Sequence, residues 1–162
     1  MSIQVGEPLP EVVLQRIREG VETIDTKALF DGRKVVLFAV PGAFTPTCSE
    51  KHLPGFVQHF EEFRRKGVEV ACMAVNDPFV MQAWGQNQHV PDGLIMLADG
   101  NADFTRALGL QLDASAYGMG RRSRRFALYA DNGTVKKLFV EAPGEFKVSS
   151  AEYMLAELAK PE

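Results

Sequence analysis

The sequence predicts an α/β fold in which a central mixed β-sheet carries helices on both faces. Short apolar runs rich in β-branched residues alternate with helical patterns, and such alternation predicts a layered sheet with parallel strands. Asn132-Gly133 then stands between two further apolar runs, which is a strong hairpin signal and makes the sheet mixed. The 162 residues suit one domain spanning residues 1–162, because no repeat or linker interrupts them.

Strands are predicted at residues 12–18, 21–25, 35–40, 68–75, 94–98, 126–130 and 134–140. The first pair flanks Glu19-Gly20 and is expected to be antiparallel, with Gly20 in the turn. The runs from 35 to 98 are almost continuously apolar, which is typical of strands covered on both faces. The last pair flanks the Asn-Gly turn.

Helices are predicted at residues 51–66, 78–88 and 102–108, and from Ser149 towards the C-terminus. The first of them should restart near Leu53, because Pro54 suits a first helical turn and not a helix interior. Its apolar residues follow at helical spacing and should face the core; they are Phe56, Val57, Phe60 and Phe63. Ser149 and Glu152 match a capping box.

The composition is that of a globular protein, with 46% hydrophobic and 24% charged residues. A net charge of −3 gives no general case for binding nucleic acid or an anionic membrane, and no apolar run approaches the ~20 residues that span a bilayer. We expect no metal and no cofactor, because neither metal-ligand spacing nor a nucleotide-binding glycine motif is present. The 2 cysteines and the lack of a visible secretory signal indicate a reducing compartment, and we expect a cytoplasmic protein.

Cys48 follows the predicted strand 35–40 and precedes a helix, within Pro41-Gly-Ala-Phe-Thr-Pro-Thr-Cys48-Ser-Glu50. Ligands bind beyond the carboxyl ends of strands in open α/β sheets. Thr45 and Thr47 are candidate N-caps, and Thr47 with Glu50 matches a capping box. Unpaired N–H groups and the helix dipole favour a thiolate there, which is the reactive form of cysteine. The alternative is a small buried apolar residue, but the polar neighbours are unlike a core.

The pattern Pro41-x-x-x-Thr45-x-x-Cys48 resembles the active-site signature of the peroxiredoxins, and PGAFTPTCSEKHLPGF resembles their type-five subfamily, called type II in plants. The similarity extends to three further strings, Val75-Asn-Asp-Pro-Phe79, Arg124-Arg-Phe-Ala127 and Val148-Ser-Ser-Ala-Glu152, and so covers nearly the whole chain. The resemblance implies a thioredoxin-like fold and a thiol peroxidase that reduces hydrogen peroxide and alkyl hydroperoxides. It also implies a homodimer with its contact near the active-site loops.

In this interpretation Cys48 is the peroxidatic nucleophile and becomes a sulfenic acid. Thr45 can face the sulfur and hydrogen-bond the peroxide, and Pro41 shapes the wall of the pocket. The backbone N–H groups from Phe44 to Cys48 are donors for the developing oxyanion. The resemblance assigns the catalytic arginine to Arg125, whose donor fork can hold the thiolate and the peroxide together.

Other polar groups near these residues allow two readings. Arg121, Arg122 and Arg124 are expected to form a solvated basic face and not a nucleic-acid patch, because the chain is acidic overall. His52, one turn after Cys48, is either a general base or, as we favour, a residue with a structural or a pocket-edge role.

Cys72 lies in the middle of a predicted strand. A buried, inert cysteine is favoured there over a resolving partner, since a disulfide needs Cα atoms within ~7 Å. Some relatives carry a resolving cysteine near the C-terminus, where this chain has Val148-Ser-Ser-Ala. We therefore expect recycling by an external thiol, either glutathione with glutaredoxin or thioredoxin.

Two rival functions are considered. A disulfide oxidoreductase is disfavoured because Cys48-Ser-Glu-Lys51 lacks the second thiol of a Cys-x-x-Cys motif. A peroxide sensor, redox relay or holdase that uses the same cysteine stays open at this point.

Overall fold

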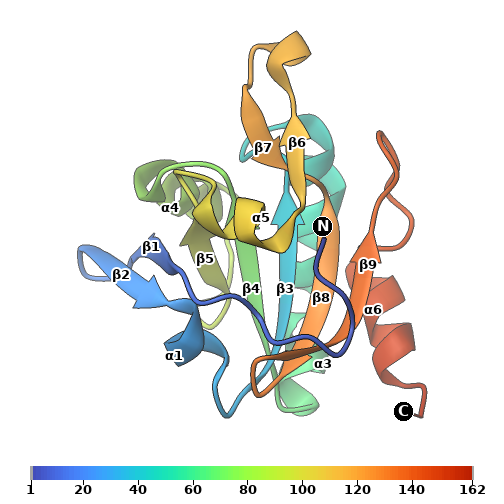
Figure 1. Ribbon diagram of the computed structural model, residues 1–162. Coiled ribbons are helices and arrows are strands. Elements are labelled where there is room, and N and C mark those ends of the chain that lie inside the picture. The colour runs from blue at the N-terminus through green and yellow to red at the C-terminus, as the bar shows by residue number, and fades with distance from the viewer. Residues whose placement is uncertain (1, 162) are drawn as a thin grey trace.

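The computed structural model describes residues 2–161 and contains a 7-stranded mixed sheet in the order β2-β1-β5-β4-β3-β8-β9 (Figure 1). Its strands are β1 (Val13–Ile17), β2 (Val21–Asp25), β3 (Lys34–Val40), β4 (Val68–Ala74), β5 (Ile95–Ala98), β8 (Phe126–Asp131) and β9 (Thr134–Val140). A separate hairpin of β6 (Gln111–Asp113) and β7 (Arg121–Ser123) projects from one end of the molecule (Figure 1).

The centre of the sheet is parallel and its edges are antiparallel. β3 and β5 both run parallel to β4, whereas β8 pairs with β3, and β9 with β8, in the antiparallel sense. The carboxyl ends of β3, β4 and β5 therefore meet at one edge, where the segment that leads to Cys48 begins. This mixed topology confirms the predicted sheet.

Helices cover both faces of the sheet, as predicted. They are α1 (Thr26–Phe30), α2 (Leu53–Gln58), α3 (Phe60–Arg65), α4 (Pro78–Asn87), α5 (Asp103–Leu108) and α6 (Ala151–Leu158), with a π-helical turn, η1 (Cys48–His52), before α2 and a 3₁₀ turn, η2 (Ser115–Tyr117), between β6 and β7. α5 lies in front of the strands and α3 behind them in Figure 1. No helix among residues 2–161 is long and apolar enough to cross a membrane.

Alternating side chains of β3 divide the core into two apolar clusters, one on each face of the sheet. Phe38 packs with Phe56 and Phe63 behind the sheet, and the Phe38 and Phe56 rings stack at 4.0 Å. Leu37 packs with Phe104 of α5 on the other face. Because both faces are buried, β3 is a nearly continuous apolar run, which is why the sequence identified it.

Several predicted boundaries are confirmed by their caps. The Asp77 side chain accepts the Val80 N–H at the start of α4, and Gly109 ends α5 with φ 72°. Asn132 and Gly133 adopt φ 51° and 78° in the predicted hairpin turn.

The predicted helix at residues 51–66 is broken twice. Leu53 does begin a new helix with Pro54 in its first turn, as expected, but a second break occurs at His59, with φ −98° and ψ 9° between α2 and α3. Neither proline nor glycine stands at this position to mark that break.

Two capping predictions are wrong. Thr47 already has helical dihedrals and makes no side-chain cap bond, so the box with Glu50 does not form. Ser150, and not Ser149, caps α6 by accepting the Tyr153 N–H. The short elements α1, β6 and β7 were not predicted, and β7 occupies part of the expected basic loop.

Candidate active site

Cys48 opens a widened helical turn. The Leu53 N–H donates to the Cys48 carbonyl five residues earlier, which makes η1 a π-helical turn and not the ordinary helix start expected from the sequence. Cys48 and His52 are both fully buried and reach the same guanidinium, that of Arg125. Such π-turns are rare and frequently occur at functional sites.

Pairing between β3 and β8 brings Arg125 to this turn. Ala39 lies opposite Phe126 in the antiparallel register, so Arg125 stands beside the end of β3, where the chain turns towards Cys48. Arg125 Nη2 donates to Cys48 Sγ at 3.1 Å. A guanidinium keeps its charge at all physiological pH values, so a fixed cation adjoins the sulfur.

His52 holds the other side of this guanidinium. Arg125 Nη1 donates to His52 Nδ1 at 2.9 Å, and His52 Nε2 donates to the Ser149 carbonyl at 2.9 Å. Since arginine only donates and a carbonyl only accepts, these partners fix the neutral Nε2–H tautomer. Burial and the Arg125 charge lower the pKa of His52 to about 3. The ring thus orients Arg125, which agrees with the structural role favoured from the sequence.

The loop before Cys48 is tightly turned. Phe44 has φ 64°, a left-handed conformation that is uncommon for a residue with a side chain, and the residue is 52% exposed. The Thr45 hydroxyl donates to the Gly42 carbonyl at 2.7 Å, which fixes the direction of its proton. Its lone pairs are left to accept a bond from a ligand.

Two polar side chains that the sequence analysis missed hold this loop in place. Asn76, directly after the end of β4, accepts the Ala43 N–H on Oδ1 at 3.0 Å. Arg122 donates from Nη1 to the Val75 carbonyl at 3.2 Å and from Nε to Met119 O at 2.8 Å. The prediction that Arg122 belongs to a solvated face is therefore wrong, because its guanidinium satisfies backbone carbonyls.

A cavity of about 250 Å³ opens beside the reactive turn. Pro41, Thr47 and Arg125 line it, together with Leu112, Tyr117, Arg124, Glu141, Ala142, Pro143, Gly144 and Glu145. Pro41 thus forms part of the wall, as expected. Arg125, whose guanidinium contacts the sulfur, is thus part of the cavity wall as well.

Cys72 lies in β4 opposite Phe38 and is fully buried, as predicted. Burial, together with the nearby Cys48, raises the pKa of the Cys72 thiol well above its usual range. Both cysteines are free. Within residues 2–161 no cluster of three or more histidine, cysteine, aspartate or glutamate side chains could hold a metal ion.

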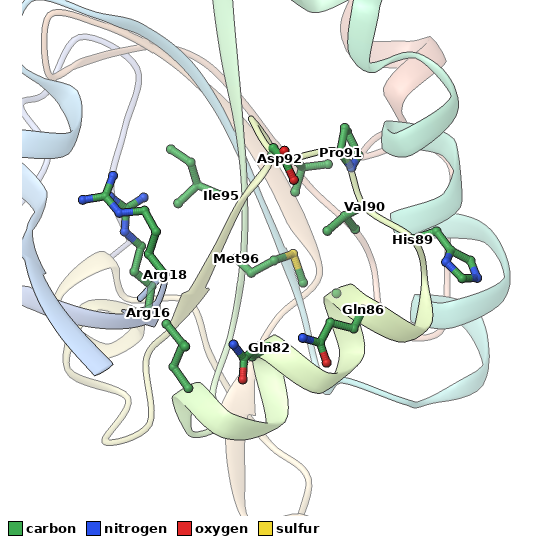
Figure 2. A pocket seen from close by; sticks show the side chains of 13 residues that line it. Arg16, Arg18, Gln82, Gln86, His89, Val90, Pro91, Asp92, Ile95 and Met96 are labelled. Carbon is green, nitrogen blue, oxygen red and sulfur yellow. The ribbon is translucent and has the colours of Figure 1, made fainter. Parts of the chain in front are cut away.

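A larger cavity, of about 600 Å³, lies away from this site (Figure 2). β1 pairs with β5 only at Gln15 and Ala98, so the two strands diverge, and α4 spans the space between them. Arg16 of β1 and Arg18, which follows that strand, face Ile95 of β5 across it in Figure 2. None of the residues predicted for the site lines this cavity.

Known proteins resemble this chain over most of its length. The Redoxin family matches residues 4–155. Peroxiredoxin-2E of Arabidopsis thaliana, a chloroplastic protein, is 49% identical over 163 residues, which cover 97% of this chain and 70% of that protein. The chain belongs to the peroxiredoxins. Peroxiredoxin-2B of the same plant is 48% identical over 163 residues, covering 96% and 98% of the two chains.

A solved structure is similarly close to this peroxiredoxin. Reduced Prx3 of Vibrio vulnificus in complex with hydrogen peroxide is 51% identical, has a TM-score of 0.92 and covers 96% of this chain and 99% of its own. The resemblance inferred from the sequence and the thioredoxin-like fold are therefore confirmed. This peroxiredoxin is a thiol-dependent peroxidase with an antioxidant function.

Proposed function

We propose that Cys48 is the peroxidatic nucleophile of this enzyme and that Arg125, Thr45 and Pro41 form its peroxide site. The observation that carries the proposal is the 3.1 Å contact between Arg125 Nη2 and Cys48 Sγ. A fixed cation on the sulfur stabilises the thiolate, which is the form that attacks peroxide. The second cysteine, Cys72, has no such partner in an apolar strand.

The thiolate attacks one peroxide oxygen, so that an S–O bond forms as the O–O bond breaks. The other oxygen takes a proton and leaves as water or an alcohol, and Cys48 becomes a sulfenic acid. Arg125 stabilises the charge on the leaving oxygen. Thr45, whose own proton is bound to the Gly42 carbonyl, accepts the peroxide O–H, and the Phe44 N–H is a further donor.

Both hydrogen peroxide and alkyl hydroperoxides are proposed as substrates. The complex of the Vibrio protein with hydrogen peroxide supports the first. The apolar side chains of Pro41, Leu112 and Pro143 in the cavity support the second, because they can pack against an alkyl group.

For recycling we propose glutathione with glutaredoxin, with thioredoxin as the alternative reductant. A glutathione thiolate attacks the Cys48 sulfenic acid and displaces water, and a second thiol releases the mixed disulfide. The burial of Cys72 supports an external thiol, because no other cysteine is present in the chain. Arg124 at the cavity can attract a glutathione carboxylate.

The test is to oxidise the protein with one equivalent of peroxide, add glutathione and map the peptides by mass spectrometry. A glutathione adduct on Cys48 is expected, both in the native chain and in the control variant Cys72→Ser. A Cys48–Cys72 disulfide that forms without added thiol and is reduced only by thioredoxin would overturn this recycling route.

We also propose a homodimer that contacts through the end carrying the active-site loops. Phe44, Phe79 and Tyr117 are 52%, 64% and 84% exposed at this end, which supports an apolar contact there. Light scattering on the reduced protein should give a dimer, and Tyr117→Asp should weaken it. A monomer at micromolar concentration would contradict the proposal.

The cytoplasm is the proposed location, on the basis of the cysteine usage alone. Fractionation of the source cells tests it, since Peroxiredoxin-2E is a chloroplastic protein. The similarity to peroxiredoxins favours the peroxidase over a dedicated sensor, relay or holdase.

A further inference from the structure

Glu141 carries a buried carboxylate that none of the roles above uses. It follows β9 and is 4% exposed. Its oxygens accept the backbone N–H groups of Lys147 at 2.9 Å, Val148 at 2.8 Å and Ser149 at 2.7 Å, and also the Ser149 hydroxyl at 2.7 Å. Three successive N–H groups and a hydroxyl thus converge on one side chain, which closes the 142–149 loop.

This loop touches the arginine–histidine pair at two points. The Ser149 carbonyl accepts His52 Nε2–H at 2.9 Å. The Phe146 ring lies 5.0 Å from the His52 ring and 5.9 Å from the Arg125 guanidinium carbon. Ala142, Pro143 and Gly144 at the start of the loop are exposed, and the Glu141 carboxylate ties residues 147–149 back to the end of β9.

We propose that Glu141 is a positioning residue for peroxide reduction. It holds the Ser149 carbonyl in place, and this carbonyl orients His52 so that Nδ1 faces Arg125. Arg125 in turn keeps its contact with the Cys48 sulfur. The physical reason is the tautomer of His52. If the Ser149 carbonyl moves away, the imidazole proton is free to shift to Nδ1, where it opposes the Arg125 donor. The inference rests on the proposed roles of Cys48 and Arg125.

The main test compares Glu141→Gln with a matched control, Asp99→Asn. Asp99, which precedes α5 in the chain, is also buried, at 2% exposure. Its carboxylate accepts the N–H groups of Phe104 and Thr105 and the Thr105 hydroxyl. Both variants replace a buried carboxylate by an amide, so both should lower the melting temperature. Only Glu141→Gln should slow single-turnover oxidation by hydrogen peroxide, by about tenfold, as expected from the loss of one hydrogen bond.

Imidazole ¹⁵N NMR on the reduced full-length protein gives a readout that general destabilisation does not change. His52 should be the Nε2–H tautomer in the native chain and in Asp99→Asn, and should become partly Nδ1–H in Glu141→Gln. In a His52→Gln background, Glu141→Gln should cause no further loss of rate, because its effect passes through that ring. An unchanged tautomer, a native rate, or a further tenfold loss in the double variant would each overturn the proposal.

If Glu141→Gln does not fold, the same rate and NMR measurements are made on Glu141→Asp, whose shorter side chain reaches fewer donors. An unchanged rate and tautomer in that variant overturn the proposal as well. Cys48→Ser separates this inference from the proposed function. Activity of Cys48→Ser would refute the nucleophile itself, whereas an inactive Cys48→Ser beside a native-like Glu141→Gln would refute only the positioning role.

Discussion

Replacing Arg125 by lysine should slow the reaction of Cys48 with peroxide while leaving a positive charge in place. The guanidinium contacts two groups at once, Cys48 Sγ at 3.1 Å and His52 Nδ1 at 2.9 Å. An ammonium is a point charge without a planar fork, so it cannot keep both contacts in this geometry. A hydrogen bond to a charged group contributes about 1.5–3 kcal/mol, which corresponds to a rate loss of about ten- to a hundredfold.

The assay is stopped-flow fluorescence during a single turnover with hydrogen peroxide. Trp84 is the natural reporter, because its Nε1 donates to the Ser49 hydroxyl at 2.9 Å, next to Cys48. Arg33→Lys is the control, since the Arg33 side chain makes an exposed pair with Glu69 at 3.4 Å, away from Cys48 in the sequence and in β3 pairing. If Arg125→Lys reacts as fast as Arg33→Lys, the fork is not needed and the reasoning is wrong.

Three further outcomes are expected. Cys48→Ser should abolish peroxidase turnover and Cys72→Ser should retain most of it, and the reverse pattern in a coupled peroxide assay would reject the assignment. A large excess of peroxide without thiol should convert Cys48 to the sulfinic acid, seen by mass spectrometry as two added oxygens, because Cys72 is too buried to trap the sulfenic acid. The hydrogen bond to Glu62, with Glu152 also nearby, raises the pKa of His59 above its ordinary value of 6.5. The protonated His59 therefore stabilises the folded state fully below pH 6.5, and this contribution to the free energy of unfolding is lost as pH rises through the folded-state pKa. Urea unfolding of the native chain and His59→Gln should therefore differ most below pH 6.5, and a difference that grows with pH would contradict this.

Local patterns were sufficient to place most strands and the reactive cysteine. β2 and β9 have the predicted bounds, because period and turn chemistry are properties of neighbouring residues. Cys48 was recognised at a strand-to-helix turn by its neighbours alone. Arg125 needed the resemblance, since nothing local separates it from Arg124.

The tertiary structure decided how these residues act together. His52 contacts Arg125 across 73 residues and Ser149 across 97, and sequence spacing does not report contacts of that length. Pairing of β8 with β3 creates the first contact, and the closure of the 142–149 loop on Glu141 creates the second. The sequence by itself therefore determined which thiol lies at a helix start, whereas only the fold brought a fixed cation to that sulfur, because the contact depends on strand register and loop closure.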